Sequence, residues 1–146
     1  MANVYSFLDV HCAITGPGGI VNLAAGAGAS EEGITFTPTE ELNTMVIGAD
    51  GTGMHSLHAG RSGSVTVRLL KTSPTNQLLA AMVAFQTASA SSHGQNTISM
   101  VDMARGDAIT AQQVAFKRRP DLSYGTQAGT VEWQFDAVKI DIALGS

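Results

Sequence analysis

Three side chains between residues 50 and 58 are of types that bind metal ions, namely Asp50, His55 and His58. With His11 they could form an incomplete metal site, which would suggest a small metal-dependent enzyme. The spacing argues against it. Two histidines three residues apart on a loop lack the helical register that puts two imidazoles on one face, and the zincin motif needs i, i+4 spacing with a glutamate between. Hydrogen bonds to backbone groups or to a neighbouring subunit explain these histidines better.

No other segment carries a recognisable catalytic motif. Residues 48–53, GADGTG, are superficially like a phosphate-binding loop, but no Lys-Ser/Thr pair follows and no helix begins behind them. The chain also lacks a G-x-S-x-G elbow and any familiar order of Ser, His and acid. We therefore expect no enzyme activity, no metal ion and no cofactor.

Composition favours a protein whose faces are covered by other molecules. The chain has 146 residues, of which 44% are hydrophobic and only 14% charged, against a typical charged share of about 25%. This length fits one domain over residues 1–146. Sixteen glycines, with many alanines, serines and threonines, supply a neutral surface of small residues. That surface suits self-assembly, and a neutral-surfaced monomer is the plainer alternative.

The net charge, the single cysteine and the apolar runs of the sequence limit the classes of partner and location that we expect. The net charge is −4, and the only basic cluster is Lys117 to Arg119, so the basic patch that binds nucleic acid is not expected. The single Cys12 cannot form an internal disulfide, in agreement with folding in a reducing cytoplasm. The N-terminus does not read as a signal peptide, and the longest apolar run, residues 78–85, is too short to span a bilayer. We expect no membrane insertion.

Strand-like segments separated by glycine-rich turns dominate the rest of the chain. A hairpin is predicted around Gly16 to Gly19, and Pro38 should end a strand or place it at a sheet edge. One helix is predicted over about residues 74–88, with Ser73 as N-cap and Pro74 in the first turn. The fold class is therefore mainly β: a sandwich or barrel of antiparallel strands with one flanking helix. Strands are expected at 4–14, 20–23, 33–37, 42–47, 64–70, 97–103, 108–117 and 131–142.

The last strand has the clearest alternation. Trp133 and Phe135 share an apolar face, while the apolar phase shifts by one residue after Ala137. A single extra residue near Ala137 and Val138 would restore the facing, so we predict a β-bulge there.

A long glycine-rich loop is expected from Gly48 to Gly63. Ordering so many glycines costs backbone entropy, and a loop this long in a compact domain is usually functional or disordered. Its interior carries Met54, Leu57 and Ala59, which need an apolar surface. A neighbouring subunit is the natural candidate for that surface.

Residues 47–74, IGADGTGMHSLHAGRSGSVTVRLLKTSP, and residues 103–141, MARGDAITAQQVAFKRRPDLSYGTQAGTVEWQFDAVKID, carry a family resemblance. The order and wording of these segments resemble small phage and prophage structural proteins, similar to the tail tube proteins of contractile phages and related to type VI secretion tube proteins. The resemblance implies a structural subunit that assembles into stacked hexameric rings, forming a hollow conduit for genome ejection. It also implies that the glycine-rich loop is an arm reaching a neighbouring subunit. The interface residues we expect on the arm are Gly48, Asp50, Gly53, Met54, His55, Leu57, His58 and Arg61.

The resemblance also suggests partners and a location. These are further copies of the chain, a tail sheath protein, and baseplate and tail terminator proteins, with DNA passing through without specific binding. The subunit would belong to the virion tail and be assembled in the host cytoplasm. Glu132, Gln134 and Asp136 form one polar face that could line the bore, or could instead point outward or between rings. The nearer alternative is the tube of a type VI secretion or other phage-derived contractile device.

Overall fold

A computed structural model of the chain describes residues 5–23, 29–127 and 129–145. The described residues form strands, one α-helix and two short 3-10 turns, η1 (Phe7–Asp9) and η2 (Ala90–Ser92). The helix is α1 (Thr75–Thr87). The strands are β1 (Val10–Gly16), β2 (Gly19–Asn22), β3 (Ala29–Pro38), β4 (Asn43–Ile47), β5 (Gly53–Leu57), β6 (Gly63–Leu70), β7 (Asn96–Asp102), β8 (Asp107–Arg118) and β9 (Thr130–Ala143).

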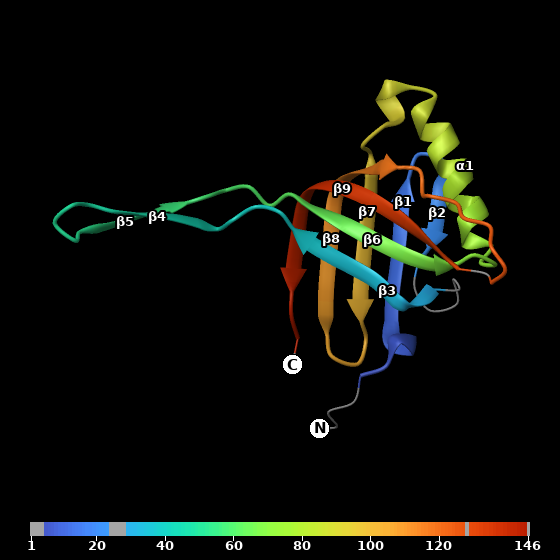
Figure 1. Cartoon of the computed structure of the whole chain (residues 1–146), viewed down its shortest axis with the longest axis horizontal. Helices are drawn as coiled ribbons and strands as arrows, with labels where there is room; N and C mark the ends of the chain where they lie inside the picture. The colour runs from blue at the N-terminus through green and yellow to red at the C-terminus, as the bar shows by residue number, and fades with distance from the viewer. Residues whose placement is uncertain (1–4, 24–28, 128, 146) are drawn as a thin grey trace.

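Seven strands form one antiparallel sheet in the order β2-β1-β7-β8-β9-β6-β3, and β4 pairs only with β5. In Figure 1, β3 and β6 cross in front of β1, β7 and β8, so the sheet curls over itself into two layers. β2 and β3 stand at the two ends of the strand order. The mainly β, sandwich-like prediction is therefore confirmed, whereas the described strands do not close into a barrel.

The core lies between the two layers. β6 buries alternate residues from Val65 to Leu69, and β9 buries Val131, Trp133 and Phe135 on the same period. Phe116 of β8 joins them, with its ring centroid 4.8 Å from that of Phe135 and 6.1 Å from that of Trp133. The alternation read from the last strand is confirmed, because a half-buried antiparallel strand must put every second side chain inside.

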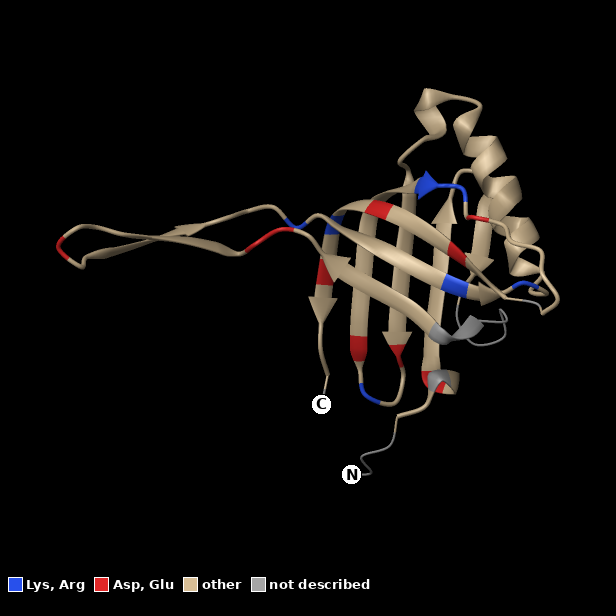
Figure 2. Ribbon diagram, in the orientation of Figure 1, with Lys and Arg blue, Asp and Glu red and all other residues tan. Residues whose placement is uncertain are grey.

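The predicted helix is confirmed to within one residue at each end. Ser73 Oγ accepts a hydrogen bond from the Thr75 N–H at 3.2 Å, but the residue at the N-cap is Pro74, with helical dihedral angles, and not Ser73. The helix buries Leu79, Met82, Val83 and Gln86 but leaves Leu78 and Phe85 exposed. It carries no Lys, Arg, Asp or Glu, as Figure 2 also shows.

A buried amide pair joins the helix to the sheet. Gln86 Nε2 donates to Asn96 Oδ1 at 2.6 Å, and Asn96 Nδ2 donates back to Gln86 Oε1 at 2.8 Å. Gln86 also bonds the Pro17 carbonyl, and Asn96 bonds the Val114 carbonyl. Every side-chain amide in this pair is therefore satisfied although both residues are buried, which is the condition for such a pair to stabilise a core.

The phase shift in β9 is real, but the predicted bulge is misplaced. Ala137 and Ile140 are buried with two exposed residues between them, yet β9 keeps an unbroken register with β8 there. The extra residue lies in β8, where three steps from Ala111 to Val114 oppose two steps of β7, from Ile98 to Asn96. Gln113 has a φ of 53° in this bulge. The predicted position was wrong because the side of the sheet that each β9 side chain faces depends on its pairing with β8.

The N-terminal hairpin is confirmed, with Gly16 opposite Gly19. Its first strand begins at Val10 rather than Val4, because residues 7–9 form a 3-10 turn. β3 is an edge strand that ends at Pro38, as predicted. Residues 24–28 lie outside the described part of the chain.

Cys12 lies on β1 and is 3% exposed. Burial raises the pKa of its thiol from 9.0 to about 12, because the thiolate would lose its hydration. The side chain therefore behaves as a small apolar residue.

Candidate assembly interface

Residues 42–58 form a hairpin arm that projects from the sheet (Figure 1). β4 and β5 pair antiparallel with Met45 opposite His55, and the ladder continues through the His58 N–H, which donates to the Leu42 carbonyl at 3.0 Å. The expected loop over Gly48 to Gly63 is therefore corrected: it contains β5. The segment Gly-Met-His-Ser-Leu has no β-branched residue, so its strand character could not be seen from propensity.

Both faces of the arm are apolar and exposed. Side chains opposite each other in a hairpin share a face, and successive residues alternate between faces. One face thus carries Met45, Ile47 and Leu57, and the other carries Leu42, Val46 and Met54. Their exposed fractions run from 52% for Val46 to 88% for Leu57. A two-stranded hairpin without a packed face is at best marginally stable in water, so the arm needs a covering surface on each side.

The tip of the arm carries one negative charge. Asp50 Oδ1 accepts a hydrogen bond from the Thr52 N–H at 3.0 Å, and Gly51 turns the chain with a φ of 89°. The hydrogen bond from the Thr52 backbone lowers the pKa of Asp50, so this carboxylate is charged at neutral pH. Asp50 is the only Asp, Glu, Lys or Arg between residues 43 and 60.

The arm does not bring its histidines and Asp50 together. His55 Nδ1 lies 3.0 Å from Asn43 Nδ2, and His58 Nε2 is hydrogen-bonded to Thr44 Oγ1 on the opposite face. Asp50 is at the tip, whereas His58 is at the base. Among the residues the structure describes, no three His, Cys, Asp or Glu side chains are close enough to hold a metal ion.

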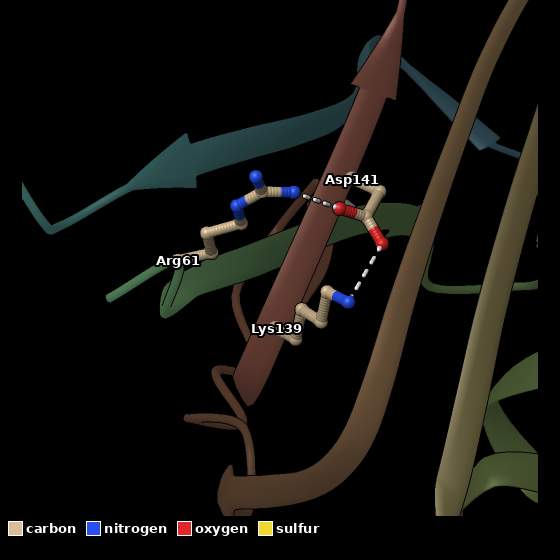
Figure 3. A network of polar contacts seen from close by, with 3 residues as sticks. All are labelled: Arg61, Lys139 and Asp141. Carbon is tan, nitrogen blue, oxygen red and sulfur yellow. Dashed lines mark hydrogen bonds and ion pairs between the residues drawn. The ribbon is translucent and has the colours of Figure 1, made fainter. Parts of the chain in front are cut away.

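The base of the arm is fastened to β9. Arg61 Nη1 contacts Asp141 Oδ1 at 2.9 Å, and Lys139 Nζ lies 3.7 Å from the other carboxylate oxygen (Figure 3). The Arg61 carbonyl also accepts a hydrogen bond from the Ile140 N–H at 2.8 Å. At Gly63 a Cβ atom would lie 2.6 Å from the Thr37 carbonyl oxygen, so only glycine fits this crossing. These contacts fix the direction in which the arm leaves the body.

The eight predicted interface residues are thus spread along the arm. Gly48 and Asp50 are at the tip, Gly53, Met54, His55 and Leu57 are on β5, and His58 and Arg61 are at the base. The sequence predicts the strand at 42–47 but not its part in the interface. This half of the arm contributes the exposed side chains of Leu42, Met45, Val46 and Ile47. The available signal was a short apolar run just before the glycine turn.

Glu132, Gln134 and Asp136 lie on the outer face of β9, alternating with its buried residues. Glu132 Oε2 is 3.2 Å from Arg68 Nε of β6, and Glu132 Oε1 accepts a hydrogen bond from Gln134 Nε2 at 2.7 Å. Asp136 is exposed. Figure 2 shows how few charges the strands carry. In the described residues, no helix is both long and apolar enough to cross a bilayer.

Several solved structures share this fold at low sequence identity. The tube-terminating cap of the anti-feeding prophage has a TM-score of 0.58 at 10% identity, over 99% of this chain and 93% of that one. The tail of an empty GTA particle, refined with C6 symmetry, has a TM-score of 0.58 at 15% identity, over 98% and 100%. The sheath-tube complex of the PVC extracellular contractile injection system has a TM-score of 0.53 at 10% identity, over 91% and 88%.

No curated protein sequence matches the chain significantly. A family model does match, and it is described as the bacteriophage PhiTE tail tube protein. The match covers residues 1–145, which includes the body, the arm and both segments that carry the resemblance. The chain therefore belongs to the bacteriophage PhiTE tail tube protein family and is a structural tube subunit.

Proposed function

We propose that the chain forms hexameric rings which stack into the hollow tube of a contractile phage tail, through which the genome leaves. The arm carries this proposal, because six large apolar side chains on its two faces are exposed in the single chain. β2 and β3 stand at the two ends of the described sheet, and such edge strands can pair with strands of neighbouring subunits. The C6 symmetry used for the GTA tail of similar fold supports six subunits in each ring.

The partners and location follow from the same proposal. Residues 1–146 act as one domain, and further copies of the chain, a sheath, a baseplate and a terminator contact the tube. The PVC complex of similar fold joins a sheath to a tube, which supports a sheath partner. The subunit is assembled in the host cytoplasm and has no catalytic role. Its fold is also found in contractile injection systems, so the tube of such a device is the second candidate.

Imaging of the purified protein tests this function. Concentrated protein should form hollow tubes in negative stain, and averaged end views should show six subunits. A chain that stays monomeric at all concentrations, or that forms rings of another symmetry, would contradict the proposal.

Glu132, Gln134 and Asp136 are proposed to line the bore. A DNA duplex carries about one charge per 1.7 Å of its axis, so cationic walls would hold it by counterion release. A double variant with Glu132→Lys and Asp136→Lys should still assemble into tubes but should eject the genome more slowly. The effect should be strongest at low salt, where charge screening is weakest. Ejection rates of assembled particles measure this effect.

The matched control is Glu132→Gln with Asp136→Asn, which removes the same charges without adding cations. It should eject close to the parental rate. If the lysine variant ejects its genome at the parental rate at every salt concentration, Glu132 and Asp136 do not line the bore.

A further inference from the structure

An apolar groove of about 420 Å³ lies between the start of α1 and the segment that follows β8. Trp133 and Val131 form its floor, and Ala80 of the helix forms one wall. The opposite wall carries Leu122 and Tyr124, which are 61% and 80% exposed. Such exposed apolar groups beside a concave surface are typical of a protein contact site.

The walls of the groove are held in place by specific contacts. Lys71 Nζ donates to the Ser123 carbonyl at 2.9 Å and lies 3.4 Å from the centre of the Tyr124 ring. Trp133 Nε1 donates to Asn76 Oδ1 at 3.0 Å, which fixes the floor to the helix. The groove is therefore formed before any partner binds, so less conformational entropy is lost on docking.

The groove is lined by two cations without an acidic partner. Among the described residues, the Lys71 ammonium group contacts a carbonyl and a ring but no carboxylate, and Arg119 makes no ion pair. In contrast, Arg61, Arg68, Arg118 and Lys139 each have a carboxylate within reach. No ion pair among the described residues therefore neutralises these two cations.

A second apolar groove has the opposite charge. It also measures about 420 Å³ and includes Ile34, Phe36 and Leu144, but its charged lining residues are Asp102 and Asp107. An incoming carboxylate would be attracted by the first groove and repelled by the second. Because the two grooves have the same volume, their charge decides which of them attracts an acidic group.

We propose that the arm tip of a second copy of this chain docks in the groove formed by Lys71, Arg119 and Trp133. Asp50 of the arm lies near the two cations, and the apolar residues next to the tip, Ile47 and Met54, cover the exposed wall and floor. This inference rests on the proposed function, because it names the surface that receives the arm. Met54 suits an irregular apolar groove, since its side chain is flexible and polarisable.

The positions of arm and groove determine how copies are related. The arm leaves the sheet at the end away from α1, whereas the groove adjoins α1 (Figure 1). One copy therefore offers its arm while its own groove stays free for the next copy. Unless two copies exchange arms, such a head-to-tail contact either closes into a ring or continues as a filament.

A charge exchange tests the contact. Asp50→Lys and Arg119→Glu, made separately, should each raise the protein concentration needed for half-maximal tube formation about tenfold or more, because like charges would then face each other. The double variant should return close to the parental concentration. Pelleted fraction and tube counts in negative stain give the measurement, and circular dichroism checks the fold of each variant.

Two controls separate charge from structure. Asp50→Asn keeps the acceptor for the Thr52 N–H and should impair assembly less than Asp50→Lys. Arg105→Glu makes the same charge change as Arg119→Glu but lies in the turn between β7 and β8, outside the groove. It should assemble at the parental concentration.

The outcomes distinguish this contact from the proposed function itself. If Arg119→Glu assembles normally, or if the double variant is no better than the single ones, the groove is not the receptor. If arm variants fail to assemble while groove variants assemble, the arm still drives assembly but docks elsewhere. If both sets assemble normally, the role of the arm is lost as well.

Discussion

Deleting the arm is expected to give a folded chain that forms no tubes. Residues 43–57 can be replaced by Asn-Gly, because the Leu42 carbonyl and the His58 N–H already form the closing hydrogen bond at 3.0 Å and this pair favours a tight hairpin turn. No described residue of the deleted segment is buried, so the core is left intact. Sedimentation should show only unassembled protein. In a separate denaturation experiment, the variant should unfold cooperatively, with a midpoint near that of the parent.

Thr44→Ser serves as the control for this deletion, since it keeps the hairpin and all its apolar residues. It should form tubes as the parent does. Tubes formed by the deleted chain would show that other contacts suffice for assembly, and loss of cooperative unfolding would show that the arm belongs to the folding unit.

Trp133→Ala should have the largest effect on stability. Trp133 is 3% exposed, its ring packs edge-on against Phe116, and its Nε1 donates to Asn76. Truncating a buried aromatic side chain typically costs about 3–5 kcal/mol, a large part of the about 5–15 kcal/mol that stabilises a domain. Urea unfolding should therefore show a sharply lower midpoint, or the protein should be insoluble.

Trp133→Phe is the matched variant, because it keeps an aromatic ring but loses the Nε1 hydrogen bond to Asn76, worth about 1 kcal/mol, and part of the buried indole volume. Its midpoint should lie between those of the parent and the alanine variant. An alanine variant as stable as the parent would mean that this face of β9 does not form the core.

Local sequence signals predicted the elements that local chemistry specifies. The turn from Gly16 to Gly19, the helix, to within one residue at each end, and the buried face of β9 are all confirmed. The family resemblance found in residues 47–74 and 103–141 is confirmed by the family match.

What the sequence could not predict depends on strand partners. β5 forms because β4 pairs with it, not because its own residues favour strands. The bulge lies in β8 because three residue steps of β8 pair with two steps of β7 at this point. Within α1, Phe85 is exposed whereas its polar neighbour Gln86 is buried, because Asn96 satisfies the Gln86 amide.

The groove was missed for a similar reason. Its cations, Lys71 and Arg119, are 48 positions apart in sequence and converge only when β9 brings Trp133 between them. Lys117 to Arg119 form one basic cluster in the sequence, yet in the structure Arg118 pairs with Asp121 and Arg119 lines the groove.

The buried thiol of Cys12 gives this subunit a built-in reporter of its folded state. Because burial raises the pKa of this thiol to about 12, far less of it is thiolate at mildly alkaline pH than in an unfolded chain. A thiol-reactive dye would therefore label unfolded subunits and leave folded ones unlabelled. Because Cys12 is the chain's only cysteine, a cysteine introduced on the arm tip would be the single reactive site of the native protein, so the arm could be followed by fluorescence while tubes grow.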